Sequence, residues 1–466
     1  MNKKMLAKVM ALTLTATSFA GLMTGCGKKD DVAKCPEGFT EINIWTSGGG
    51  DYEIQKQMHQ EFNETVGKEN KVWVNYQLKD AQALDVAKSS GGERPDLWGG
   101  NLVEAVDKGE IVAYDDMPGG KEFLAKYEGT GREKTNMIDG KTYCVPYRSQ
   151  VRGLAYNKDM FKAAGIVDEK GEAKAPETWD ELVEAAKKLT DKSKNEFGFV
   201  VPMKWGAWFE YYLTSNITAV NGFGTYNPHT GKYDYSGMKP IMNAFLQMKK
   251  DGSIYPGSET LDNDPARSKF AVGNIGMMFT VDWDVAVWNK QFPAECDWGV
   301  APIPNLDKEH PYKQNSYWSY TSYIDAESAK TKADAIMVYL KWMTGEDYAK
   351  RAYELGSCLP YDFKMIEGVK PVDGLKGWEE FAALLDGYCK EENSPIAIYT
   401  DTTGVAALAD EFVNKVWTDG SATVDEIVDA YEKACNDGIA KYQELHPDYD
   451  PSVATVDPNW QPELRD

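Results

Sequence analysis

Two groups of aromatic and acidic residues contain the side chains best suited to hold a ligand. Trp205, Trp208 and Tyr211 fall in one short stretch, and Asp282 stands directly before Trp283. Flat aromatic rings match the C–H face of a sugar ring at low entropy cost, while carboxylates match its rim of hydroxyl groups. The same residues would suit a cationic ligand, through cation–π contacts and ion pairs. Packing in a core is the plainer alternative for each aromatic ring.

The sequence carries no familiar catalytic or metal-binding motif. It has no P-loop, no G-x-S-x-G, no H-E-x-x-H and no C-x-x-C, and its four histidines lie far apart. We therefore expect no metal and no cofactor. With 73 acidic residues, the chain could still hold the paired carboxylates of a glycosidase, although nothing marks such a pair. A secreted carbohydrate-active enzyme therefore stays an alternative to a protein that only binds.

Cys26 is predicted to carry a covalent lipid. Residues 1–25 begin with lysines and continue with mostly apolar or small residues, which is typical of a signal peptide. Small residues stand directly before Cys26, and the stretch resembles the bacterial lipobox, with Met23 in place of the usual Leu. The resemblance implies cleavage before a diacylated Cys26, with residues 26–39 as a tether. An ordinary signal peptide beside a chance cysteine is the alternative.

The length, charge and cysteine content of the chain limit its number of domains, its partners and its covalent links. The chain of 466 residues predicts roughly two to three domains of ~150 residues each. Its net charge of −22 argues against a nucleic-acid partner, because phosphates would be repelled, and favours solubility outside the cell. After residue 25, no apolar run approaches the ~20 residues of a membrane span. The six other cysteines are widely spaced, so both disulfides and buried free thiols stay open.

The elements that would position these residues begin with a strand–helix–strand unit. Strands are expected at 42–45 and 72–78, where apolar residues alternate, and a helix with apolar residues four apart lies between them. This order predicts an α/β domain with a parallel sheet, in which ligands bind past the carboxyl ends of the strands. Trp45, Ser47 and Asp51 follow the first strand and form a candidate cleft wall. A tight glycine turn is the alternative for this loop.

Helices dominate later in the chain. Thr178 with Glu181, and Thr423 with Glu426, have the spacing of a capping box before apolar stripes. Residues 333–343 have the periodicity of a further amphipathic helix. No Pro/Gly/Ser linker divides the chain, so two domains would be joined by more than one crossing.

Six short motifs follow one another along most of the chain. They are G-E-R-P-D-L at 92–97, K-T-Y-C-V-P-Y at 141–147, Y-N-K-D-M-F at 156–161, P-E-T-W-D-E-L at 176–182, F-A-V-G-N-I-G-M-M at 270–278 and D-W-G-V-A-P-I-P at 297–304. In this order they resemble the family-1 extracellular solute-binding proteins, which are the receptors of carbohydrate ABC importers. Gly276 departs from the family pattern, where Ala is usual.

The resemblance implies an α/β, two-lobe periplasmic-binding-protein-like fold, with a hinge and a ligand cleft between the lobes. By analogy, residues 40–146 and 302–350 form lobe 1, and residues 147–301 and 351–466 form lobe 2. Such lobes close on a ligand by bending at the hinge.

The resemblance also implies roles for the candidate site residues. It places Trp283 where the family stacks a tryptophan on sugar, and it places Tyr147 and Arg148 at the hinge, within reach of both lobes. A surface salt bridge is the alternative for Arg148. The complete set of candidate ligand-binding residues is Trp45, Ser47, Asp51, Asp96, Trp98, Tyr147, Arg148, Trp205, Trp208, Tyr211, Asp282, Trp283, Trp318, Tyr320 and Tyr399.

The resemblance implies that the protein binds its ligand without catalysing a reaction on it. A monomeric receptor would bind an extracellular sugar, an oligosaccharide in our interpretation, and deliver it to the permease subunits of an ABC importer. The lipid anchor would hold it at the outer face of a cell membrane, preferably in a Gram-positive cell. The same fold with a polyamine or peptide ligand is a second alternative.

Overall fold

The computed structural model describes residues 34–46, 48, 50–79, 81–132, 135–390, 406–445, 457 and 459–465. Within these ranges, the side chains of residues 81, 207–208, 386–390, 442–443 and 445 are not described. Residues 1–25, Cys26, Ser47 and Tyr399 lie outside the described residues, as does the side chain of Trp208. Residues 40–466 form one compact unit. In the described part of the chain, no helix combines the length and apolar character needed to cross a bilayer.

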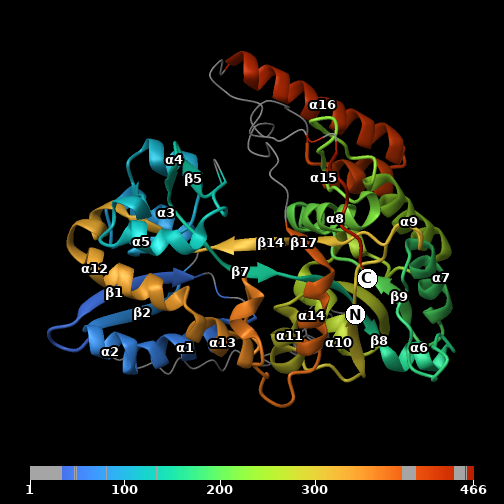
Figure 1. The fold of residues 1–466 in the computed structure, drawn as a ribbon. Coiled ribbons are helices and arrows are strands. Elements are labelled where there is room, and N and C mark those ends of the chain that lie inside the picture. The colour runs from blue at the N-terminus through green and yellow to red at the C-terminus, as the bar shows by residue number, and fades with distance from the viewer. Residues whose placement is uncertain are drawn as a thin grey trace, which may run out of the picture. The chain divides into compact units, whose positions relative to one another are not determined.

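Lobe 1 is built mainly from the segment between β1 and β6, around a five-stranded sheet of order β2-β1-β3-β15-β4 (Figure 1). β1 runs parallel to both β2 and β3, as the strand–helix–strand pattern predicts. β15 arrives from much later in the sequence and pairs antiparallel with β3 and β4. The elements are β1 (Thr40–Thr46), α1 (Tyr52–Glu64), α2 (Val66–Asn70), β2 (Val72–Leu78), α3 (Ala81–Ser90), β3 (Leu97–Trp98), α4 (Leu102–Asp107), β4 (Ile111–Val112), α5 (Gly120–Leu124), β5 (Met137–Ile138), β6 (Lys141–Thr142), β15 (Tyr323–Asp325) and α12 (Ala326–Met343).

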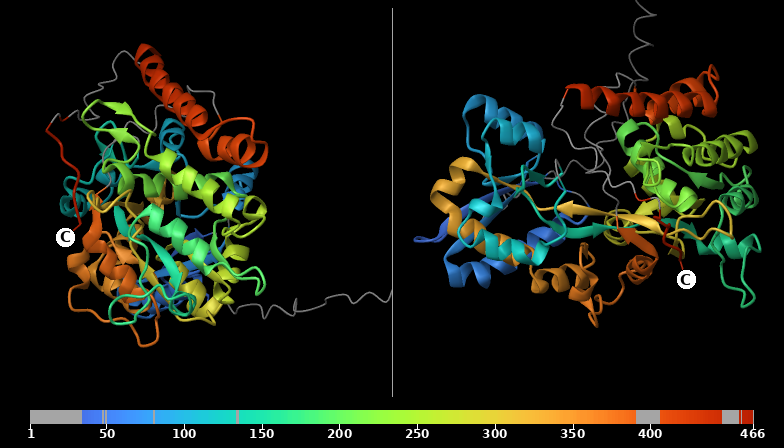
Figure 2. Two further views of the ribbon diagram at one scale, coloured as in Figure 1. Left: turned by 90° about the vertical axis from the view of Figure 1, so that its right-hand side faces the viewer. Right: turned by 45° about the horizontal axis from the view of Figure 1, so that its top comes forward.

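Lobe 2 is built around a four-stranded sheet of order β13-β8-β12-β9, with its own cores. β12 is buried along its whole length and is apolar apart from Thr280, as expected for a strand that is covered on both faces. α16 packs on α9 and α15 at the surface of this lobe (Figure 2). The elements are β8 (Arg152–Asn157), α6 (Lys158–Ala163), α7 (Trp179–Leu189), β9 (Phe197–Val200), α8 (Gly206–Asn221), β10 (Tyr226–Asn227), β11 (Lys232–Tyr233), α9 (Met238–Asp251), α10 (Asn263–Ala271), β12 (Ile275–Val281), α11 (Asp284–Ala286), β13 (Trp298–Ala301), α14 (Trp378–Ala383), α15 (Leu408–Glu411) and α16 (Val424–Leu445).

A third sheet, of order β16-β7-β14-β17, carries the chain between the lobes (Figure 1). β7 leads from lobe 1 into β8 of lobe 2, and β14 leads back from lobe 2 towards β15. The two strands pair antiparallel, with Ser319 opposite Arg148. We call this sheet the hinge sheet. Its strands are β7 (Pro146–Gln150), β14 (Gln314–Tyr320), β16 (Leu359–Pro360) and β17 (Tyr388–Lys390).

The segment after residue 302 contacts lobe 2 before the chain returns to the sheet of lobe 1. The side-chain Nδ2 of Asn305 donates to the carbonyl of Ala219 in α8, so the segment after residue 302 packs on lobe 2. The chain rejoins lobe 1 only at β15. It then stays there through α13 (Glu346–Glu354), where the Tyr348 hydroxyl donates to the Gln55 side chain of α1 at 2.9 Å. We therefore assign the second segment of lobe 1 to residues 321–354.

The helix starts follow the expected capping chemistry. Thr423 and Glu426 form a reciprocal capping box, in which each backbone N–H donates to the other side chain. At α7, Thr178 accepts from the Glu181 N–H, but the Glu181 carboxylate accepts from the Glu177 N–H one residue earlier. The helix expected at 333–343 begins sooner, because Asp325 caps the amides of the first turn of α12.

Candidate functional site

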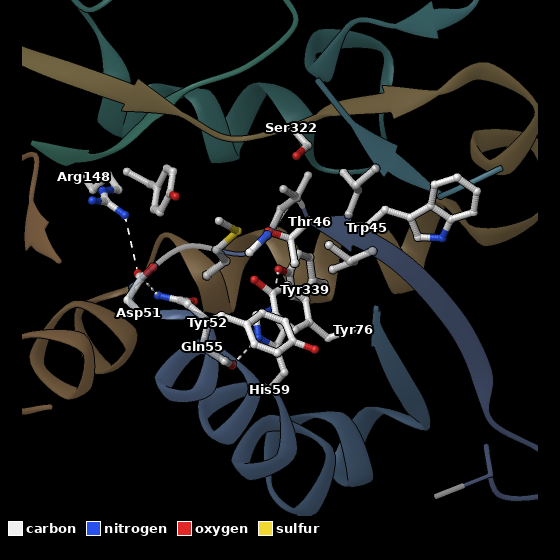
Figure 3. Close-up of a pocket in the computed structure, with 16 residues that line it drawn as sticks. Trp45, Thr46, Asp51, Tyr52, Gln55, His59, Tyr76, Arg148, Ser322 and Tyr339 are labelled. Atoms are coloured by element: carbon white, nitrogen blue, oxygen red, sulfur yellow. Dashed lines mark hydrogen bonds and ion pairs between the residues drawn. The ribbon is translucent and has the colours of Figure 1, made fainter. Parts of the chain in front are cut away.

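A cavity of about 260 Å³ opens at the carboxyl end of β1, where it meets the amino end of α1 and the hinge strand β7 (Figure 3). Four predicted residues line it: Trp45, Asp51, Tyr147 and Arg148. This is the edge of a parallel sheet at which the sequence pattern predicts a ligand. The strand–turn–helix order of residues 40–64 therefore brings a polar loop and a helix amino end to one place.

The loop after β1 needs its glycines. Gly48 adopts φ of +85°, the left-handed region that other residues rarely enter. A Cβ atom on Gly50 would lie 3.2 Å from the backbone oxygen of Trp283, so only a bare backbone passes comfortably this close to lobe 2. Asp51 ends the loop and precedes α1, where the positive end of the helix dipole favours a carboxylate.

Arg148 joins two carboxylates at the wall of the cavity. Its Nη1 lies 3.7 Å from Asp51 Oδ2, and its Nη2 lies 3.6 Å from Asp282 Oδ2. Asp51 also accepts a hydrogen bond from Ser357 at 2.9 Å. The side chain of Asp282 is fully buried, and this burial raises its pKa to about 6 although Arg148 opposes the shift.

His59 forms a further wall of the cavity and was not expected from the sequence. Its Nδ1 donates to the carbonyl of Gln55 at 2.6 Å, so its Nε2 accepts from the Tyr339 hydroxyl at 2.9 Å. Its ring stacks on Tyr76, with centroids 4.2 Å apart. Burial lowers the His59 pKa to about 4, so the ring is neutral at pH 7. The i, i+4 spacing of Gln55 and His59 was the available signal.

Tyr211 packs on the hinge sheet. Its hydroxyl donates to Gln150 Oε1 at 2.7 Å, at the end of β7. The guanidinium of Arg152 lies 3.9 Å from the centre of the Tyr211 ring and 4.0 Å from that of Tyr317, on β14. A cation between two rings is a favourable arrangement in a buried site. In this structure, Tyr211 thus helps fix α8 to the hinge strands.

The remaining aromatic candidates lie in different surroundings. Trp283 is partly exposed, and the guanidinium of Arg148 lies 5.8 Å from its ring centre. Trp205 is 57 % exposed at the start of α8. Trp318 lies under Arg132, 4.9 Å from its ring centre, and Tyr320 packs against a lobe 1 core. Trp283 therefore lies beside the arginine that pairs with Asp51 and Asp282.

Asp96 and Trp98 serve the interior of lobe 1. Asp96 is 2 % exposed; its carboxylate accepts from the Asn43 N–H at 2.7 Å and pairs with Lys332 at 2.9 Å. Trp98 is 4 % exposed, and its indole nitrogen donates to Asp325. Both residues tie β3 to its neighbours, and neither is among the residues lining the cavity.

The structure shows how potential metal ligands and cysteines are arranged in the part of the chain that it describes. No group of three His, Cys, Asp or Glu side chains there could hold a metal ion. Cys35, Cys144, Cys296, Cys358 and Cys435 are free thiols, and the side chain of Cys389 is not described.

Comparison with known proteins places the fold in a family. The profile of the bacterial extracellular solute-binding proteins matches residues 52–350. The chain belongs to this family. Among curated relatives, the sn-glycerol-3-phosphate-binding periplasmic protein UgpB of Brucella melitensis is 27% identical over 354 residues, which cover 72% of this chain and 77% of the relative.

Solved structures share the two-lobe architecture. The ABC substrate-binding protein Lmo0181 from Listeria monocytogenes, in complex with cycloalternan, superposes with a TM-score of 0.61 at 18% identity, covering 86% of this chain and 99% of that one. The GacH receptor of Streptomyces glaucescens, studied with acarbose, superposes with a TM-score of 0.63 at 19% identity, covering 88% and 100%. These likenesses show the fold.

Proposed function

We propose that the protein is the substrate-binding receptor of an ABC importer, which captures an extracellular sugar between its lobes and delivers it to a membrane permease. The observation that carries the proposal is the cavity at the carboxyl end of β1, with Arg148 of the crossing strand in its wall. Trp283 of lobe 2 stands beside Arg148 and offers a partly exposed ring for stacking. The two structural neighbours, which were solved with cycloalternan and with acarbose, support this ligand class.

The charges of the site favour an uncharged ligand over a phosphate. The ionised groups in the cavity wall are Asp51 and Arg148, and Asp282 lies directly behind Arg148. The one guanidinium is thus already shared between two carboxylates. A phosphate would have to displace them while facing their repulsion. We therefore do not transfer the ligand in the name of UgpB to this chain. A cationic ligand is the second candidate, because the three charges sum to a negative site beside Trp283.

We also propose that the protein does not cut its ligand. A glycosidase needs one carboxyl group to protonate the glycosidic oxygen and a second to attack or to activate water. Asp51 and Asp282 are the carboxylates at this site, and both engage Arg148. Asp282 has no exposed surface with which to reach a glycosidic bond.

The location and partners complete the proposal. Lipidated Cys26 would hold residues 26–39 at the outer face of a cell membrane, preferably in a Gram-positive cell, beside the permease subunits. The protein would act there as a monomer.

Ligand screening by thermal shift tests the proposal. The chain from residue 27 onward should be melted with raffinose, maltotriose and chitin oligosaccharides, and with glycerol-3-phosphate and spermidine as contrasting charges. A ligand that binds the folded state raises the melting temperature with its concentration. We expect stabilisation by a neutral oligosaccharide. Stabilisation by glycerol-3-phosphate or spermidine alone would contradict the sugar proposal, and shorter glycans after long incubation would indicate an enzyme.

A further inference from the structure

The guanidinium of Arg148 stands between carboxylates that belong to different lobes. Asp51 precedes α1 in lobe 1, Asp282 follows β12 in lobe 2, and Arg148 lies on β7 of the hinge sheet. The two nitrogen–oxygen separations are 3.7 and 3.6 Å, and the Arg148 side chain is only 12 % exposed. Ion pairs that are shielded from water in this way are screened little by salt.

Each carboxylate is also held by hydrogen bonds, apart from its ion pair with Arg148. The backbone N–H of Asp282 donates to the Val151 carbonyl at 2.9 Å, and the Val151 N–H donates back to Asp282 Oδ1 at 3.2 Å. On the other side, Asp51 accepts from Ser357 at 2.9 Å, and Gln55 binds both Ser357 and the Tyr348 hydroxyl. Arg148 therefore stands between two carboxylates that are each positioned by further hydrogen bonds.

We infer that Arg148 and Asp282 are positioning residues that tie the two lobes together at the hinge and so set the arrangement in which the loop after β1 meets Trp283. The close approach of Gly50 to the Trp283 backbone marks this arrangement. Loss of either ion pair would free the lobes to turn about the hinge sheet, because β7 and β14 are the strands that pass between them. The inference does not depend on the ligand, since the pairs are formed by the chain alone.

The ion pair between Arg148 and Asp282 should respond to pH. Asp282 is buried, which raises its pKa to about 6, so its charged fraction falls from nearly all at pH 7.5 to about a tenth at pH 5. The ionisable groups that act on it are Arg148, Asp51, Tyr211 and Cys358. Burial raises the pKa of Tyr211 and of Cys358, so both stay uncharged over this range. Protonation of Asp282 removes its attraction for Arg148, and acid should loosen the lobes.

Asp284 supplies a matched control two residues away. It is also fully buried and also paired with an arginine, since Arg267 Nη2 lies 2.7 Å from its Oδ1. Arg267 belongs to α10, so this pair lies wholly within lobe 2. Asp284→Asn therefore removes a buried, ion-paired carboxylate without touching the hinge.

Small-angle X-ray scattering of the ligand-free protein tests the inference. The radius of gyration of the wild type should increase as the pH falls from 7.5 to 5. Asp282→Asn and Arg148→Met should show the larger value at pH 7.5 and little further change with pH. Asp284→Asn should follow the wild type at both pH values, and melting curves of the same samples confirm that each variant is folded.

Two results would overturn the inference: a wild-type radius of gyration that is constant over this pH range, or an Asp284→Asn variant that behaves like Asp282→Asn. The pH titration of the wild type needs no variant, so the inference can still be tested if a substituted protein fails to fold. Because no ligand is present, failure of the sugar proposal would leave this result unaffected, and the converse also holds.

Discussion

Trp283 is the residue at which stacking on a ligand can be separated from packing in a core. Its ring is partly exposed beside Arg148, so Trp283→Ala should weaken sugar binding at least tenfold while altering the melting temperature little. Stacking contributes ~0.5–1.5 kcal/mol beyond buried area, and one decade in affinity corresponds to ~1.4 kcal/mol. Calorimetric titration with the ligand found by screening, together with thermal melting, measures both effects.

Trp288 provides the contrast for that experiment. It is 1 % exposed in the core of the same lobe, so Trp288→Ala should cost ~3–5 kcal/mol of stability. If Trp283→Ala instead shows this large loss of stability and keeps its affinity, the stacking role is wrong.

The buried carboxyl group of Asp282 predicts how stability depends on pH. Its pKa of about 6 in the folded chain exceeds the ordinary 3.8, so the folded state holds this proton more tightly than the unfolded state. The resulting stabilisation is fully present below about pH 3.8 and is lost as the pH rises through about 6. Relative to Asp282→Asn, the wild type should gain ~1.4 kcal/mol in free energy of unfolding between pH 7.5 and pH 5, out of a full effect of ~3 kcal/mol at lower pH. Urea unfolding of both proteins at pH 5 and pH 7.5 measures the difference, and a constant difference would contradict it.

At the scale of single elements, the start of α7 offers a defined test. The Thr178 hydroxyl accepts from the Glu181 N–H at 3.2 Å, and loss of such a cap costs ~1 kcal/mol. Thr178→Ala should lower the free energy of unfolding by about that amount, whereas Thr178→Ser should restore most of it. Chemical denaturation of the wild type and of the two variants measures these differences. Equal stability of the Ala and Ser variants would show that the cap contributes nothing.

The helices and strands that depend on neighbouring residues could be predicted from the sequence. Features that depend on contacts between distant segments could not. The alternation in β1 and β2 and the caps of α7 and α16 depend on neighbouring residues, so the sequence alone was enough. Asp96 and Trp98 resembled ligand-binding residues because their partners, Lys332 and Asp325, come from a distant segment that buries them. The course of the chain after residue 302 could not be derived from local pattern either, since it depends on contacts with α8.

At the scale of the whole molecule, the amino-terminal segment predicts membrane attachment. Cys26→Ala should leave the fold intact but should either release the protein or leave the precursor uncleaved, because two acyl chains provide stable anchorage where one does not. Cell fractionation and mass spectrometry of the amino terminus measure both outcomes. A variant that still fractionates with membranes and carries lipid would contradict the lipobox interpretation.

The late arrival of β15 constrains when the protein can fold. This strand lies inside the sheet of lobe 1, between β3 and β4, yet it is made by residues 323–325. A nascent chain that has emerged only as far as lobe 2 therefore holds two lobe 1 strands with unpaired edges, which are prone to aggregate. Pairing over such a long loop is also slow to form. A ribosome must therefore make about three quarters of the 466 residues, as far as the end of α13 at Glu354, before the first lobe can be completed.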